Sequence, residues 1–200
     1  MTFISMLRGA FAALAALSLA ACGINTVPAA EEDAKAKWAD VEAQFQRRAN
    51  LIPNLAEVTK GAGENERTIL SQVTEARAKA TSVNVTANDL TDPAKMEQFA
   101  AAQSQIGAGI GRLLASVEAY PTIQSTQNYL ALQSQLEGTE NRIAVAIRDY
   151  NEAVRKYNTT IRTFPDIIGA KVIHGAEPMV AYKSVTEGAE AAPSLDMTTN

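Results

Sequence analysis

Residues 136–164 read LEGTENRIAVAIRDYNEAVRKYNTTIRTF. Apolar and aromatic residues recur in this stretch at steps of three, four or seven, at positions Leu136, Ile143, Ile147, Tyr150, Val154, Tyr157, Ile161 and Phe164. This spacing places the side chains along one face of a helix and is typical of helices that pack side by side. Gln133 and Glu140 occupy vacant positions of the same series. The stretch therefore predicts a long helix, over about 122–163, with one buried face.

Two earlier segments have the same rhythm. In 32–61 it runs through Trp38, Val41, Phe45, Ile52 and Leu55, and Arg48 fills the vacant position. The segment 92–120 repeats it, and begins with Asp92 and Pro93 as a predicted helix cap and first turn. A shorter helix is expected over 64–81. Four helices with short connections predict an all-α fold, an elongated antiparallel four-helix bundle with coiled-coil-like packing and a long C-terminal helix.

The composition limits the chemistry available to the chain. Its 200 residues include one Cys and one His, and the formal net charge is −4. One Cys cannot form an intramolecular disulfide, and a zinc site usually needs several Cys or His ligands. The Glu-x-x-His motif of di-iron bundles is absent, because Lys171 stands three residues before His174. Negative charge argues against nucleic-acid binding. We therefore expect no cofactor, no metal site and no catalytic residues.

The first residues predict an export signal. The run from Gly9 to Ala21 is apolar apart from one serine, and Arg8 precedes it. The run ends in Leu19-Ala20-Ala21-Cys22, which is similar to a bacterial lipobox. We expect cleavage before Cys22 and acylation of its thiol, palmitate included, which would anchor the chain in lipid. An uncleaved N-terminal anchor is the alternative.

This interpretation divides the chain into four parts. They are a signal peptide over 1–21, a lipidated tether over 22–30, a helical bundle over 31–178 and a mostly disordered tail over 179–200. The expected location is the bacterial cell envelope, with the bundle facing the periplasm. Gly23 stands where an Asp would favour inner-membrane retention, so the outer membrane is slightly favoured.

Polar residues within the helical pattern are the remaining candidates. Arg48 and Glu140 both fall on predicted buried faces, and because lone buried charges are costly, we hypothesise that they pair inside the bundle. The alternative is that each reaches the rim. Arg148, Arg155 and Arg162 recur every seven residues, as do the pairs Tyr150-Asn151 and Tyr157-Asn158. A docking face for a partner and an ordinary solvated stripe beside core tyrosines both explain the arginines.

These segments resemble the LemA family of bacterial envelope proteins over about 36–178. The similar motifs are QRRANLIPNL at 46–55, EAYP at 118–121, LEGTENRIA at 136–144, the two Tyr-Asn pairs, and Phe164-Pro165. The motif residues are Arg48, Pro53, Tyr120, Pro121, Glu140, Asn141, Arg142, Tyr150, Asn151, Tyr157 and Asn158. The chain departs from the family pattern in its lipobox, where many members have a transmembrane helix, and at Ile147-Arg148-Asp149 and His174-Gly175.

The resemblance implies a membrane-tethered bundle with no established enzymatic activity. The expected function is that of a non-enzymatic adaptor or binding module at the periplasmic membrane face. Because the family's members often accompany membrane-bound zinc proteases or TPM-type envelope domains, such a protein is the expected partner. The alternative is a structural scaffold that self-assembles through the arginine stripe and a groove at Gly107 and Gly111.

Overall fold

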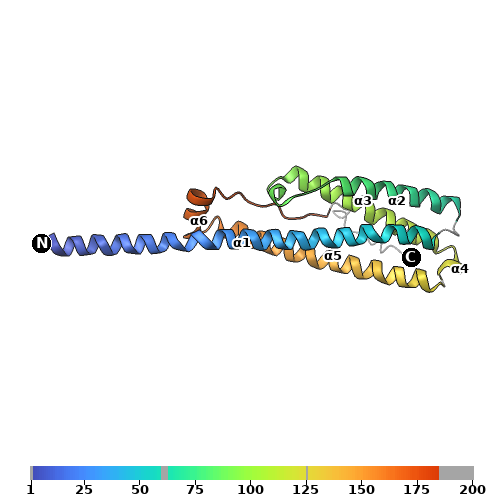
Figure 1. The fold of residues 1–200 in the computed structure, drawn as a ribbon, viewed down its shortest axis with the longest axis horizontal. Coiled ribbons are helices and arrows are strands. Elements are labelled where there is room, and N and C mark those ends of the chain that lie inside the picture. Colours follow the sequence, from blue (N-terminus) through green and yellow to red (C-terminus); the bar gives the residue numbers. More distant parts are fainter. Residues whose placement is uncertain (1, 60–62, 125, 185–200) are drawn as a thin grey trace, which may run out of the picture.

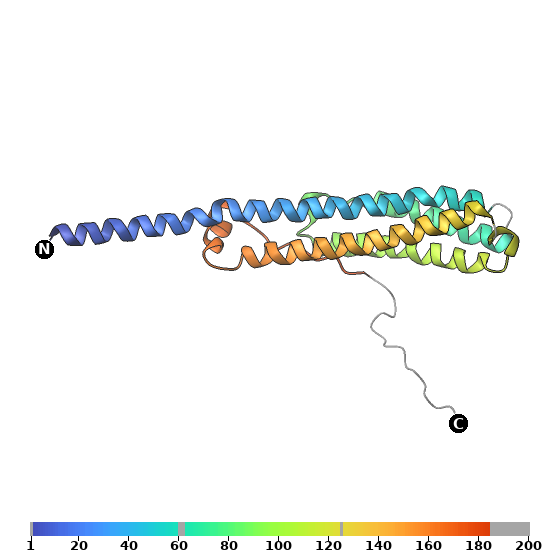
Figure 2. The ribbon, with the colours of Figure 1, turned by 90° about the horizontal axis from the view of Figure 1, so that it is seen from below.

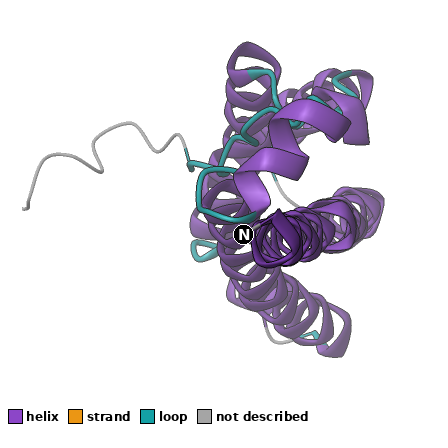
Figure 3. Cartoon of the chain, turned by 90° about the vertical axis from the view of Figure 1, so that its left-hand side faces the viewer, coloured by secondary structure: helices purple, strands orange, loops and turns teal. Residues whose placement is uncertain are grey.

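The computed structural model describes residues 2–59, 63–124 and 126–184. Within these ranges every regular element is helical (Figure 3). The elements are α1 (Thr2–Val58), α2 (Glu64–Ser82), the 3-10 helix η1 (Ala87–Asp89), α3 (Pro93–Val117), α4 (Pro121–Gln124), α5 (Gln127–Thr160), α6 (Asp166–Gly169) and the π-helical turn η2 (Ala170–His174). The predicted all-α class is confirmed.

The four long helices run alternately up and down the bundle (Figure 1). Their closest pairings are α1 with α5 and α2 with α3, and α6 packs against α1. Seen from the perpendicular direction, the same helices remain side by side over most of their length (Figure 2). The predicted elongated antiparallel bundle is thus what the chain forms.

The buried core follows the heptad positions. Near the α6 end, Trp38 packs between Phe99 and Tyr150, with ring centroids 5.3 and 5.1 Å away. Further along the bundle the core consists of aliphatic side chains such as Leu55 and Ile106. Phe164 is an exception, because its side chain is 68% exposed. Helix α5 ends at Thr160, so the spacing that predicted burial of this residue no longer applies there.

Three predicted boundaries differ from the structure. Helix α1 already includes residues 23–30, where a tether was expected, and Val27 and Ala30 are buried in the core. The fourth predicted helix is divided into α4 and α5, and the Thr126 hydroxyl caps α5 by accepting a hydrogen bond from the Tyr129 N–H. The predicted tail begins with an ordered segment, because Met179 and Tyr182 are buried, and 185–200 lie outside the described residues.

The close approach of α2 and α3 occurs at Gly109, which lies between Gly107 and Gly111, the two glycines where the sequence suggested a groove. A Cβ at Gly109 would lie 2.8 Å from Cγ2 of Val73, a buried residue of α2. At Gly107 the nearest atom would be Nη1 of Arg48, at 3.4 Å, and at Gly111 nothing lies within 4 Å. Gly109 therefore allows α2 and α3 to touch, whereas Gly111 borders open space.

Alanine substitutions at these two glycines should have opposite effects. We expect Gly109→Ala to lower the free energy of unfolding by about 1–2 kcal/mol, because overpacking against the stiff Val73 outweighs the better helix propensity of alanine. Gly111→Ala should raise it by about 0.5–1 kcal/mol, since only the propensity term acts. Urea denaturation of both variants tests this. A stabilised Gly109→Ala protein would contradict the close contact.

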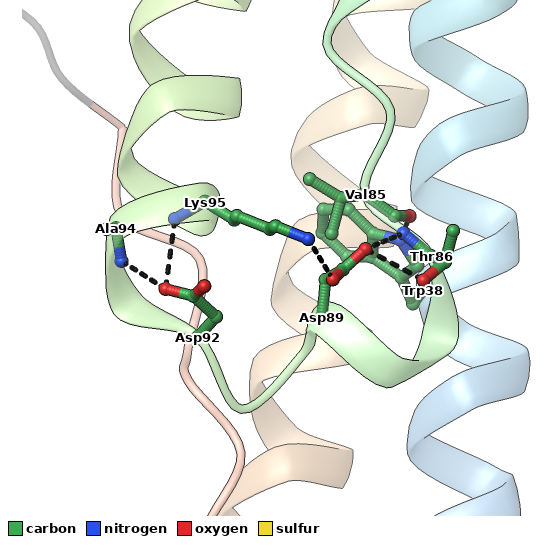
Figure 4. A network of polar contacts seen from close by, with 7 residues as sticks. All are labelled: Trp38, Val85, Thr86, Asp89, Asp92, Ala94 and Lys95. Atoms are coloured by element: carbon green, nitrogen blue, oxygen red, sulfur yellow. Dashed lines mark hydrogen bonds and ion pairs between the residues drawn. The ribbon is translucent and has the colours of Figure 1, made fainter.

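The connection between α2 and α3 is fixed by polar contacts (Figure 4). The Trp38 indole N–H donates to the carbonyl of Val85 at 3.1 Å. The Asp89 carboxylate accepts from the backbone N–H and the hydroxyl of Thr86, and it forms an ion pair with Lys95. Asp92 caps α3 as predicted by accepting from the N–H groups of Ala94 and Lys95. The connection is thus an ordered part of the bundle.

The Asp89 carboxylate should make stability depend on pH. Hydrogen bonds from Lys95 and Thr86 lower the pKa of Asp89 from 3.8 to about 2. Because the folded-state pKa is depressed, the stabilisation is present above about pH 4 and is lost as pH falls towards 2. Asp89→Asn should therefore destabilise the protein at pH 7, and its difference from the wild type should vanish near pH 2. Urea midpoints across this range test it, with Glu75→Gln as a control for loss of an exposed charge. Parallel pH curves for wild type and Asp89→Asn would contradict the prediction.

Candidate functional site

Three of the four long helices contribute to a polar cluster in the middle of the bundle. Arg48 of α1 donates from Nη2 to the backbone carbonyl of Gln103, at 2.7 Å, and to its side-chain Oε1, at 2.9 Å. Its Nη1 lies 3.3 and 3.5 Å from the two carboxylate oxygens of Glu140 on α5. The guanidinium carbon also lies 5.0 Å from the centroid of the Phe45 ring. These contacts join α1, α3 and α5 through one side chain.

The two charges of this cluster have different environments. The Arg48 side chain is 5% exposed, whereas that of Glu140 is 50% exposed. Arg48 therefore lies inside the bundle, as the pairing hypothesis expected of both residues. Glu140 lies at the rim, as the alternative expected of both, and the two side chains are still in contact. Gln103, which is also buried, is the partner that the charge argument missed. Its position in the heptad series was the available signal, because a polar residue on a buried face needs a hydrogen-bond partner.

A groove of about 620 Å³ lies beside this cluster, between α3 and α5. One wall is formed by α3 and the other by α5, with lining residues Gly107, Ile110, Gly111, Leu114, Leu136, Glu137, Glu140 and Asn141. Its α3 wall is apolar, since it consists of Ile110, Leu114 and two glycines. The groove is open beside Gly107 and Gly111, because these residues have no side chains. Its α5 wall offers carboxylate and amide groups. Such a groove can accept an apolar helix face that has a polar or basic edge.

The Tyr-Pro motif has a structural role at the opposite end of the bundle from α6. The Tyr120 hydroxyl donates to Oε2 of Glu66 at 3.0 Å, and Glu66 is buried in the first turn of α2, where the helix dipole favours a negative charge. A Cβ on Gly63 would lie 2.8 Å from the Tyr120 hydroxyl oxygen. Pro121 begins α4 directly after this contact. The motif therefore connects the turn before α2 with the turn between α3 and α4.

The two Tyr-Asn pairs hold the ordered segment that follows η2. Gly175 ends η2 with a φ of 56°, and the chain then runs back along the bundle (Figure 1). We call residues 176–184 the strap. Asn158 donates to the carbonyl of Met179 at 2.8 Å and accepts from its N–H at 2.9 Å. Asn151 makes the same pair of bonds with Tyr182, at 3.0 and 2.8 Å.

The spacing of the two asparagines matches an extended chain. Seven residues of helix span about 10.5 Å, and three residues of extended chain span about 10 Å. Between the clamped residues, the Tyr150 hydroxyl donates to the carbonyl of Val180, and the Val180 N–H donates to the carbonyl of Leu90, both at 2.8 Å. Burial raises the pKa of Tyr150 and raises that of Tyr182 to about 12. Tyr150 and Tyr157 are core residues, as in the interpretation of a solvated stripe beside core tyrosines. The sequence analysis did not predict that Asn151 and Asn158 bind the strap.

Six of the remaining predicted residues are exposed, namely Pro53, Asn141, Arg142, Arg148, Arg155 and Arg162. Arg148 pairs with the neighbouring Asp149 at 3.0 Å, and Arg155 lies 3.8 Å from Glu152 on the same helix. Arg162 is also exposed, just after α5, so docking through the arginine stripe stays a prediction. Pro53 and Asn141 are exposed, and Arg142 donates to the Thr139 hydroxyl at 3.4 Å. Cys22 lies in α1, and its acylation stays a prediction.

The ranges that the structure describes with their side chains, which begin at residue 25, hold neither a candidate metal site nor a candidate membrane span. Those ranges contain no group of three or more His, Cys, Asp or Glu side chains placed to hold a metal ion. In the same ranges, none of the helices combines the length and the apolar content that a membrane crossing requires.

The fold and the polar cluster define a class of protein, the elongated antiparallel helical bundle with a buried arginine shared among three helices. The sequence profile of the LemA family matches residues 37–196, and the chain belongs to the LemA family. Magnetosome proteins MamQ 1 and MamQ 2 of Paramagnetospirillum magneticum are each 31% identical to it, over 70% of this chain and 58% of theirs. Protein LemA of Metamycoplasma hominis is 27% identical, over 62% of this chain and 52% of its own. The chain thus spans little more than half the length of these relatives.

Proposed function

We propose that the protein is a lipid-anchored, non-enzymatic envelope protein that acts as an adaptor at the periplasmic membrane face. In this proposal the groove between α3 and α5 receives a helix of a partner protein, for which an envelope protease or a TPM-type protein is our candidate. The single observation that supports docking is the groove itself, because a Cβ at Gly111 would meet nothing within 4 Å. Family membership and the lipobox-like Leu19–Cys22 support the envelope location.

The anchor is tested by fractionation of cells that express the full chain. The wild-type protein should pellet with membranes and should have acyl chains on Cys22 by mass spectrometry. Cys22→Ser should move it into the soluble fraction or leave an unprocessed precursor of higher mass. A processed Cys22→Ser protein that still pellets would contradict the lipid anchor.

The groove is tested by a photoreactive amino acid at Gly111, where the structure has room for it. The matched control is Arg112, the next residue of α3, which is exposed on the side that faces α2. We expect a heterologous crosslinked product from position 111 and little from position 112. A product of twice the mass of the chain would support the self-assembling scaffold instead. Equal products from both positions would contradict specific docking in the groove.

A further inference from the structure

Exposed apolar side chains gather at one end of the bundle. The described residues include six large hydrophobic side chains that are exposed, and four of them lie within ten consecutive residues: Phe164 at 68%, Ile168 at 43%, Val172 at 79% and Ile173 at 56%. The other two, Leu130 and Val145, are separated along α5. We call the segment 164–174, which includes α6 and η2, the α6 lobe. Contiguous apolar exposure of this kind marks a contact surface.

The α6 lobe buries its small residues and exposes four of its five large apolar ones, the fifth being the half-buried Ile167. Gly169 and Ala170 are buried, and Ala170 belongs to the same core cluster as Val27, Ala30 and Ala34 of α1. The lobe is thus attached to the bundle through residues that bury little apolar area. Its four exposed large apolar side chains contribute little to that packing, so a contact outside this chain accounts for them better than the core does.

The position of the α6 lobe relative to Cys22 indicates which surface the lobe contacts. Figures 1 and 2 both place α6 at the end of the bundle from which the N-terminal part of α1 projects. Val27 is packed in the core, five residues after Cys22. Five residues of helix span about 7.5 Å. If Cys22 is acylated, as in the proposed function on which this inference rests, the lobe therefore lies at the bilayer surface.

The charged residues of the lobe region also suit a lipid surface. Arg162 and Lys171 are exposed next to the apolar side chains in sequence and can pair with headgroup phosphates, whereas Glu177 is exposed and Asp166 is half-buried. With two charges of each sign, residues 162–177 carry no formal net charge, so apolar insertion is the main contribution. We propose that the α6 lobe inserts Phe164, Ile168, Val172 and Ile173 into the leaflet that holds the acyl chains of Cys22. This second contact fixes the orientation of the bundle relative to the membrane.

The test places a fluorescent reporter in the lobe of the full, lipidated protein. The protein is reconstituted into vesicles of phosphatidylethanolamine and phosphatidylglycerol whose acyl chains are brominated, and which quench tryptophan on contact. Phe164→Trp reports on the lobe. Leu130→Trp is the matched control, because Leu130 is 54% exposed and lies near α4, at the opposite end of the bundle. The native Trp38 is 2% exposed and gives a constant background.

We expect brominated lipid to lower the added emission of Phe164→Trp about twofold or more, and to leave Leu130→Trp unchanged. Equal quenching at the two positions would overturn the proposal while leaving the anchor intact, provided that the protein floats with the vesicles. A lipidated protein that does not float would overturn both. A dimer in detergent that dissociates on Val172→Ser would show that a second copy covers the patch, and would also overturn the proposal.

Discussion

Truncation of Arg48 to alanine is expected to lower the free energy of unfolding by about 3 kcal/mol, whereas Glu140→Ala should cost less than about 1 kcal/mol. The two residues form one ion pair, at 3.3 Å, yet they differ tenfold in side-chain exposure. Arg48→Ala removes a buried side chain and leaves Oε1 of the buried Gln103 without its donor. Glu140→Ala removes a carboxylate that water already solvates, and Arg48 keeps both of its bonds to Gln103.

Urea denaturation of the two variants measures this asymmetry. Equal losses would show that the ion pair, rather than the bonds to Gln103, holds Arg48. A double-mutant cycle with Arg48→Met and Glu140→Leu isolates the pair itself, and we expect a coupling of about 0.5–1 kcal/mol because Glu140 lies at the rim. A coupling below about 0.5 kcal/mol would refute the pairing hypothesis.

The fold could be predicted from periodicity because each long helix buries one face. Trp38, Phe99 and Tyr150 occupy heptad positions on three helices and meet in the core. Boundaries were less predictable, because they depend on tertiary contacts. The stretch 23–30 is helical even though it contains Pro28, and its Val27 is buried in the core, which a view limited to local sequence cannot detect.

The candidate site could be predicted only in part. A charge on a buried face indicates that a partner exists, and Glu140 was found in this way, but Gln103 accepts partly through its backbone carbonyl, which no residue type reveals. The same reason explains why the strap was missed. Asn151 and Asn158 bind backbone groups of Met179 and Tyr182, so the residue types of the strap could not reveal these hydrogen bonds.

Loss of both asparagine clamps should release the strap from the bundle. In the double variant Asn151→Ala and Asn158→Ala, the N–H and C=O groups of Met179 and Tyr182 lose four hydrogen bonds. At about 1 kcal/mol for each bond, the opening equilibrium of the strap should rise at least thirtyfold, even if half of this value is recovered by water. The rest of the bundle should keep its helical content, because Tyr150 and Tyr157 remain in the core.

Two measurements on this double variant report on the strap alone. Limited proteolysis should cut within the strap at least thirtyfold faster than in the wild type, as long as opening is rapid relative to cleavage. Ultraviolet titration should show the pKa of Tyr182 falling from about 12 towards 10 as its ring becomes exposed. Asn141→Ala, at an exposed asparagine of the same helix, is the matched control and should change neither result. If the double variant resists protease as the wild type does, burial of Met179 and Tyr182 is sufficient to hold the strap, and the amide clamps are dispensable.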